Sequence, residues 1–317
     1  MKKILIAGPG NSGSGAVLDY LKSRQDTFLP FSNEEFRIVC DPNGISSLED
    51  NFFKNFSINN SANAYHEFKK FCENLSCFKN QKKELVYPEE FSSIFKRYLN
   101  DIKYLDYNGL PRFQKFKLSF FEKLNYLTKS IILKENISKV NVFKMILPIH
   151  YEEFLQITKN FIDQIIVNSK EFQKDKVAVL DQCVNIFNLE DNIKYFRDSK
   201  CIITLRNPIG TYHSIFQNPS MAYAGLDTKK FIKWYKFIYN EINKLKFNEN
   251  CLIINFEDFV LNNQETKDKI HYFFDLDEQK TNFNIKDSLK NVTQIENEIE
   301  KESLKLIKSE LKEFISN

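Results

Sequence analysis

The chain has 317 residues, of which 42% are hydrophobic and 27% charged, so it can bury a sizeable core in one large α/β domain or two small ones. The formal net charge of +3 is too close to zero to indicate a nucleic acid as partner, whereas a local basic patch would suit a small anion. Six cysteines occur without a CxxC pair or a Cys/His cluster, which predicts reduced thiols and no metal site.

No apolar run approaches the roughly 18 residues that span a bilayer. The first apolar stretch is only Ile4 to Ala7 and leads directly into a glycine-rich segment, which is not the pattern of a signal peptide. We therefore expect a cytoplasmic protein without an integral membrane segment.

Short apolar runs alternate with longer helical patterns along the chain. Strands are expected at residues 4–7, 36–40, 140–146, 177–180, 201–205 and 251–256. Helices are expected at about 14–24, 62–75, 90–105, 150–168, 188–197, 209–217, 228–247 and 263–274. Nearly continuous apolar strands separated by helices predict a three-layer α/β fold, with a P-loop-like parallel sheet flanked by helices.

Two parts of the chain depart from this alternation. Residues from about 50 to 137 are polar, aromatic and helical in pattern, and we interpret them as a helical insertion within a single domain that spans 1–317. Residues 296–317 have apolar side chains along one side and predict a terminal amphipathic helix.

A glycine-rich turn, Gly-Pro-Gly-Asn-Ser-Gly-Ser-Gly at 8–15, follows the first strand. Its glycines permit a close approach of the backbone, and serine hydroxyls add donors, so it predicts an anion site at a helix N-terminus. The nucleoside-triphosphate pattern fails because Ser14-Gly15 replace Lys-Ser/Thr, and the dinucleotide pattern lacks its acidic partner. The alternative is a tight turn without a ligand. The candidate ligand-binding residues are Gly10, Asn11, Ser12, Gly13, Ser14 and Gly15.

A second anion site is predicted where the strand at 201–205 ends. Arg206 follows the strand, Pro208 can open a helix, and Ser214 lies one to two turns into that helix. The alternative is that Arg206 pairs with a carboxylate such as Asp181.

Together these segments resemble the sulfotransferases that use 3′-phosphoadenosine 5′-phosphosulfate. Their 5′-phosphosulfate loop is similar to residues 11–15, and their 3′-phosphate motif to Arg206-Asn207-Pro208 with Ser214. The Glu-Asp motif after the strand at 251–256 and the strand ending in Asp181-Gln182 are also similar. The resemblance covers about 1–42 and 175–280, and neither loop is specific alone.

The resemblance implies transfer of a sulfuryl group from that donor, leaving adenosine 3′,5′-bisphosphate, to a hydroxyl or amine of a glycan or small molecule, as in capsule polysaccharide biosynthesis. Asn11 replaces the family's basic loop residue, so Lys144, or Lys286 or Lys290, is expected to supply the charge. A related transferase that moves a phosphoryl-type group such as phosphoramidate is the alternative. A P-loop nucleoside or sugar kinase, and a nucleotide-binding assembly protein with weak catalysis, also remain open.

Attack by the acceptor requires a general base. Glu35 lies in a stretch that resembles the catalytic glutamate segment of glycosaminoglycan sulfotransferases, and it is the predicted base. Asp181 and His150, each at the carboxyl end of an expected strand, are the rival catalytic residues.

Overall fold

The structure, a computed structural model, describes residues 1–31, 34–109, 124, 128, 143–217, 221–277 and 283–315. It consists of two compact units. The first is formed by residues 1–37 and 169–317, and the second by residues 38–168.

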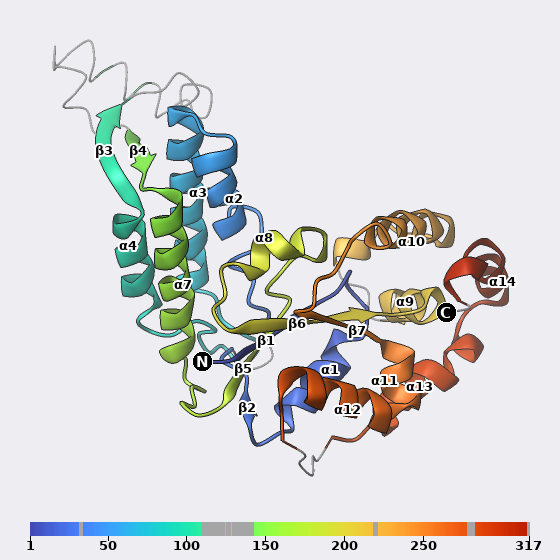
Figure 1. The fold of residues 1–317 in the computed structure, drawn as a ribbon. Coiled ribbons are helices and arrows are strands. Elements are labelled where there is room, and N and C mark those ends of the chain that lie inside the picture. Colours follow the sequence, from blue (N-terminus) through green and yellow to red (C-terminus); the bar gives the residue numbers. More distant parts are fainter. Residues whose placement is uncertain are drawn as a thin grey trace. The chain divides into compact units, whose positions relative to one another are not determined.

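The first unit contains a five-stranded parallel sheet with the order β2-β5-β1-β6-β7 (Figure 1). The strands are β1 (Lys3–Ala7), β2 (Thr27–Phe28), β5 (Val177–Asp181), β6 (Ser199–Leu205) and β7 (Cys251–Asn255). Every residue of β1 is buried, because this strand lies between β5 and β6 and both faces of the sheet are covered. The expected α/β class with a parallel sheet flanked by helices is confirmed.

Helices cover both faces of this sheet. Figure 1 shows α1 (Ser14–Lys22), α11 (Phe256–Leu261) and α12 (Asn263–Phe274) on one side, and α8 (Leu189–Ile193) and α10 (Thr228–Ile242) on the other. Alternate strand residues, among them Ile4, Ile6 and Ile202, pack against the first group. A second apolar cluster joins α9 (Pro208–Gln217), α10 and α14 (Lys301–Glu310), and α13 (Lys286–Thr293) precedes α14.

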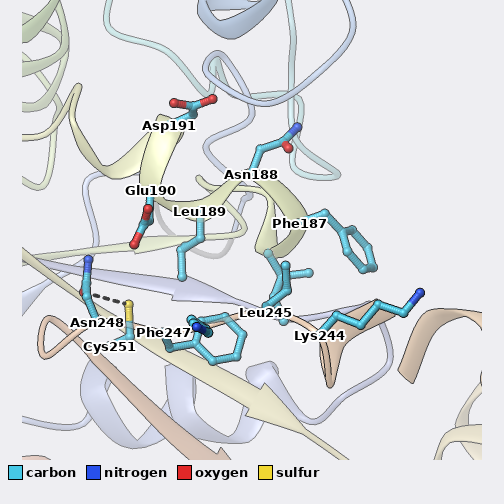
Figure 2. Close-up of a pocket in the computed structure, with 12 residues that line it drawn as sticks. Phe187, Asn188, Leu189, Glu190, Asp191, Lys244, Leu245, Phe247, Asn248 and Cys251 are labelled. Atoms are coloured by element: carbon cyan, nitrogen blue, oxygen red, sulfur yellow. Dashed lines mark hydrogen bonds between the residues drawn. The ribbon is translucent and has the colours of Figure 1, made fainter. Parts of the chain in front are cut away.

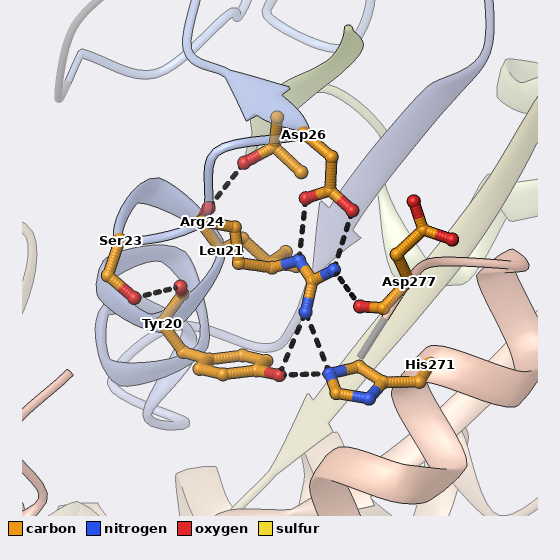
Figure 3. Close-up of polar contacts among 8 residues, drawn as sticks. Tyr20, Leu21, Ser23, Arg24, Asp26, His271 and Asp277 are labelled. Carbon is orange, nitrogen blue, oxygen red and sulfur yellow. Dashed lines mark hydrogen bonds and ion pairs between the residues drawn. The ribbon is translucent and has the colours of Figure 1, made fainter. Parts of the chain in front are cut away.

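A buried arginine connects the end of α1 to α12 (Figure 3). All five N–H donors of Arg24 are used: two contact the Asp26 carboxylate at 2.8 and 2.6 Å, and one contacts the Asp277 carbonyl at 2.7 Å. The other two reach Tyr20 Oη at 3.3 Å and His271 Nε2 at 2.8 Å. Burial of this guanidinium is tolerated because its charge and its donors are satisfied.

The second unit is mainly helical. Its elements are α2 (Ile45–Glu49), the π-helix η1 (Asp50–Lys54), α3 (Ile58–Ser76), α4 (Phe91–Asp101), α7 (Tyr151–Val167), and an antiparallel pair, β3 (Lys103–Gly109) and β4 (Phe143–Pro148). Aromatic side chains form its core: Tyr98 stacks on Phe161 at 4.2 Å between ring centroids and donates to or accepts from Thr158 at 3.0 Å.

Two expected strands of the main sheet are wrong. Ile38 and Val39 are buried, but their carbonyls accept hydrogen bonds from Ile45 and Ser46 at the start of α2, so residues 36–40 form turns rather than a strand. Residues 143–148 do form β4, yet they pair antiparallel with β3 in a separate sheet; positions 140–142 lie outside the described residues.

The expected C-terminal helix is shorter than the apolar pattern indicated. It covers Lys301–Glu310 and lies between the short 3₁₀ segments Ile295–Glu298 and Lys312–Phe314. Positions 316 and 317 lie outside the described residues. The expected insertion at 50–137 falls within the second unit.

Candidate functional site

The turn between β1 and α1 is built from left-handed residues. Gly10, Asn11 and Gly13 have φ angles of 86°, 51° and 88°, a conformation that glycine adopts freely and asparagine tolerates. Turns of this kind gather successive backbone N–H groups around a concavity that binds anions. The sequence has glycine or asparagine at each position that needs this conformation.

Two glycines of the same turn have no room for a side chain. A Cβ atom on Gly10 would lie 2.5 Å from Tyr223 Oη, and a Cβ atom on Gly13 would lie 2.2 Å from the Phe256 ring. At Gly15, in contrast, an added Cβ meets nothing within 4 Å. Gly10 and Gly13 are therefore required by both backbone angle and packing.

The two serines of the turn differ. Ser12 Oγ is buried and lies 2.8 Å from Thr204 Oγ1, while the Thr204 hydroxyl donates to the Ala7 carbonyl at 3.3 Å. Because each hydroxyl carries one proton, Ser12 donates to Thr204 and can reach a ligand only through its backbone N–H. Ser14 Oγ accepts a hydrogen bond from Gln182 at 3.3 Å and keeps its own proton.

The N-terminus of α1 follows directly. Gly13 is its N-cap, no side chain caps it, and its first turn contains no acidic residue. The first N–H groups of a helix need external acceptors and carry a partial positive charge. This helix end therefore has the donors and the polarity that a phosphate needs.

Arg206 follows β6 and is only 6% exposed. Its guanidinium lies 4.4 Å from the centre of the Phe256 ring and donates from Nη2 to the Asn291 carbonyl at 2.9 Å. Its Nε is buried and has no hydrogen-bond partner among the described residues. Gly210 makes room for it, since a Cβ there would lie 2.5 Å from Nε.

Burial lowers the pKa of Arg206, partly offset by the nearby charge of Glu257. No ion pair joins Arg206 to a carboxylate within the described part of the chain, so the predicted alternative pairing with Asp181 is not found. A buried guanidinium with an unused N–H calls for an anion.

Ser214 and the glycine turn are in contact. Ser214, in α9, donates from Oγ to Asn11 Oδ1 at 3.2 Å. Phe256 lies against both Gly13 and the Arg206 guanidinium. The two predicted anion sites are thus neighbouring parts of one region at the carboxyl ends of β1, β6 and β7.

Asp181 ends β5, next to β1, where it pairs in register with Ile6. Its Oδ1 is buried without a partner among the described residues. Burial first, and then the charge of Glu35, raise the pKa of Asp181 to about 7. The backbone N–H of Phe36 donates to the Asp181 carbonyl at 3.0 Å and holds the Glu35 segment at this strand end.

Glu35 differs from Asp181 in its surroundings. Its carboxylate accepts from Arg37 Nη1 at 2.8 Å, and both side chains are about half exposed. The structure thus brings two of the three predicted catalytic residues together: a carboxyl group with a raised pKa and a solvated, ion-paired one. His150 lies in the second unit, at the N-cap of α7.

The three lysines expected to replace the loop lysine lie on β4 and α13. Lys144 lies on β4 of the second unit and donates to Asp106 at 2.7 Å. The expectation that Lys144 lies at the end of a strand of the main sheet is therefore wrong. Lys286 and Lys290 belong to α13, the helix whose Asn291 carbonyl accepts from Arg206.

The sequence does not reveal that Tyr223 contacts the glycine turn, or that Phe256 contacts both the turn and Arg206. Tyr223, in the 3₁₀ segment Met221–Tyr223, lies against Gly10, and no motif marks it. Phe256 was expected as the last residue of a strand, whereas it starts α11 and separates the turn from Arg206.

Among the described residues, no group of three or more His, Cys, Asp or Glu side chains is arranged to hold a metal ion. Within that same part of the chain, no helix combines the length and apolar composition needed to cross a bilayer.

No protein-family model and no curated protein matches the chain. Solved structures similar to it include a sulfotransferase domain from the curacin biosynthetic pathway, with 16% identity, a TM-score of 0.39, and 88% of this chain and 75% of that one covered. A sulfotransferase from Mycobacterium avium has 9% identity, a TM-score of 0.38, and 98% and 76% coverage. One from Alicyclobacillus acidocaldarius has 9% identity, a TM-score of 0.37, and 94% and 96% coverage. Identities and scores this low do not assign the chain to a family.

Proposed function

We propose that this protein is a sulfotransferase-like group transferase whose donor is a nucleotide with separate 5′ and 3′ phosphate groups, of the 3′-phosphoadenosine 5′-phosphosulfate type. The observation that carries the proposal is the buried, unpartnered Nε of Arg206, eight residues before a serine that contacts the glycine turn. A nucleotide with a single phosphate chain needs only one anion site. Two neighbouring sites of different construction suit a donor that is phosphorylated at two positions.

The residues of the region fit such a donor. The backbone from Asn11 to Gly15, the Ser14 hydroxyl and the α1 N-terminus would hold the 5′-phosphate, which is the leaving group. Arg206 would hold the 3′-phosphate by a charge-assisted hydrogen bond. Ser214 would add a hydroxyl donor by exchanging its hydrogen bond to Asn11 Oδ1 for one to the phosphate. The donor supplies an activated sulfuryl group; the protein contributes fixed dipoles where negative charge develops on the leaving phosphate.

The proposed general base is Asp181. Its unpartnered oxygen can accept the proton of an acceptor hydroxyl or amine, and a pKa of about 7 is matched to proton transfer near neutral pH. Glu35 is bonded to Arg37, so in this proposal it acts through its charge on Asp181. The resemblance of its segment to glycosaminoglycan sulfotransferases supports a glycan of the surface-polysaccharide type as acceptor.

Asn11 favours a second candidate, transfer of a phosphoryl-type group such as phosphoramidate from a 3′-phosphonucleotide. Its amide oxygen accepts from Ser214, and no cation lies within residues 8–15. Asn11→Lys should increase sulfuryl transfer if the missing charge limits that reaction. An Asn11→Lys protein that binds the sulfate donor normally, without any gain in transfer, would favour the second candidate.

Nucleotide binding tests the central assignment. Arg206→Ala should weaken the binding of adenosine 3′,5′-bisphosphate by roughly 1.5–3 kcal/mol, the typical value of a hydrogen bond to a charged group. The binding of 5′-AMP should be nearly unaffected. Calorimetric titration of both nucleotides measures the difference. Arg97→Ala, which removes a charge from an exposed position of α4, is the control.

Retained 5′-AMP binding would also show that the variant is folded. Equal losses for the two nucleotides would refute the 3′-phosphate assignment. Wild-type stabilisation by ADP but not by adenosine 3′,5′-bisphosphate would refute the function itself and favour a kinase.

A further inference from the structure

A cavity of about 550 Å³ lies on the face of the first unit that carries α8 and α10 (Figure 2). Residues 186–191, from the 3₁₀ segment Ile186–Asn188 and α8, form one side of it. Residues 244–248 and Cys251 form the other. Cys251 is the first residue of β7, so this cavity is at the amino end of that strand, whereas the proposed transfer site follows the carboxyl ends.

Two cysteines lie directly opposite each other at this point. Cys201 of β6 and Cys251 of β7 are register partners in the parallel sheet, so their side chains point to the same face. Neighbouring strands are about 4.8 Å apart, within the usual Cα separation of about 4.4–6.8 Å for a disulfide. Cys201 is completely buried, whereas Cys251 is partly exposed and lines the cavity.

We propose that Cys201 and Cys251 form a redox-modifiable dithiol, oxidised by a low-molecular-weight disulfide that enters through this cavity. The Cys251 thiolate attacks one sulfur of the disulfide, forms a mixed disulfide and releases the first thiol. The Cys201 thiolate then attacks the Cys251 sulfur and releases the second thiol. Two protein thiols lose two electrons and two protons, and one disulfide is reduced to two thiols.

The cavity lining indicates the chemical class of that disulfide. Lys246 and Glu190 bring opposite charges, and neither has an ion-pair partner among the described residues. Asn188 and Asn248 add amide groups. Figure 2 shows apolar side chains on both sides, with Leu189 on one and Leu245 and Phe247 on the other. This mixture suits an amino-acid or short-peptide disulfide that carries both a carboxylate and an ammonium group.

Access favours Cys251 as the residue attacked first. Its thiol donates to Asn248 Oδ1 at 3.5 Å (Figure 2), and burial, with the charge of Glu190, raises its pKa. Cys251 is therefore mostly protonated at neutral pH, and exchange should take minutes to hours. Cys201, without exposed surface, can react only after Cys251.

Peptide mapping by mass spectrometry tests the proposal on the whole folded chain. Incubation with glutathione disulfide, followed by blocking of free thiols, should yield a peptide pair cross-linked through Cys201 and Cys251. Cys201→Ser should stop at a mixed disulfide on Cys251, and Cys251→Ser should leave Cys201 reduced. Absence of the cross-link, or a Cys201→Ser protein that stays unmodified at Cys251, would overturn the proposal.

An internal control and a control disulfide complete the test. Cys77 is exposed at the end of α3 and should form a mixed disulfide without a subsequent cross-link. Lys246→Ala should slow cross-linking by glutathione disulfide several-fold and leave the rate with uncharged 2-hydroxyethyl disulfide unchanged. Equal slowing with both reagents would overturn the recognition of a charged disulfide.

Discussion

At the scale of single residues, variants of Asp181 and Glu35 distinguish most sharply which of the two carboxylates is the general base. Asp181→Asn should lower turnover by about 10²–10⁴, because it removes the proposed base while keeping the shape of the side chain. Turnover of the wild type should rise with pH through about 7, the pKa of Asp181. A stopped-time sulfuryl-transfer assay between pH 5 and 9 measures both.

Glu35→Gln should retain turnover and move the same rise to lower pH. The charge of Glu35 contributes to the raised pKa of Asp181, so its removal makes Asp181 easier to ionise. Glu35→Gln with little turnover and an unshifted profile would instead identify Glu35 as the base, as the sequence predicts.

Asp181 should also destabilise the folded protein above neutral pH. A carboxyl group whose folded pKa is raised from 3.8 to about 7 contributes stability below pH 4 that is lost as pH rises to 7. Asp181→Asn should therefore raise the free energy of unfolding at pH 8 by about 1–3 kcal/mol, and by little at pH 4. Urea unfolding at both pH values measures this difference; an equal gain at both would contradict it.

The sequence predicted the residue types of this site better than their roles. Glycine, asparagine and arginine mark their own positions because backbone angle and charge need those residue types. The role of Ser12 depends on Thr204, which is 192 residues away in the chain, and no local pattern reveals that contact. Asp181 and Glu35 are distinguished by burial and by the contact of Glu35 with Arg37, and the extent of burial likewise requires the fold.

At the scale of elements, the turn between β1 and α1 offers a matched pair of glycines. Gly13→Ala should abolish adenosine 3′,5′-bisphosphate binding and lower stability, because its φ is 88° and the added Cβ would overlap the Phe256 ring. Gly15→Ala, where the space is open, should retain binding and gain about 0.5–1 kcal/mol of helix stability. Titration and thermal unfolding of both variants would show whether the turn is needed in this conformation.

The junction between α1 and α12 supplies a stability prediction. Asp26→Ala would leave the Arg24 guanidinium, whose side chain is fully buried, without its charge partner. We expect a loss of about 2–4 kcal/mol in the free energy of unfolding. Lys2→Ala, which breaks an exposed ion pair with Asp275, should leave the urea midpoint unchanged; similar losses for both would contradict the role of burial.

Element type followed from apolar continuity where strands are buried on both faces, as in β1, β5 and β6. The pattern failed where apolar residues are buried without pairing in a sheet. Ile38 and Val39 are buried, but their backbone forms turns. It also missed β3, because Tyr104, Leu105 and Tyr107 are exposed and the strand Lys-Tyr-Leu-Asp-Tyr-Asn-Gly does not alternate in burial.

At the scale of the whole molecule, the proposed nucleotide should protect only parts of the first unit. Hydrogen exchange with saturating adenosine 3′,5′-bisphosphate should slow at residues 8–16 and 206–214. The free energy of unfolding of the first unit should rise by about 2.7 kcal/mol when the nucleotide concentration is 100 times its Kd. Exchange in α3 and α4 of the second unit serves as the internal reference. Unchanged exchange at 8–16 would contradict the proposed binding region.

The order of strands in the sheet has a consequence during synthesis. The neighbours of β1 are β5 and β6, not β2, so its first partner begins at Val177, 170 residues after Ala7. At 5–20 residues per second, a ribosome needs about 10–30 s to make that interval. During this time the apolar segment Lys3–Ala7 has no strand of the main sheet to pair with except the two-residue β2, which is not its neighbour. The second unit, 38–168, is complete before Val177 is made. An apolar strand that stays unpaired for this long in a nascent chain exposes surface that chaperones bind. We therefore expect chaperone contact at the segment that leads into the glycine turn.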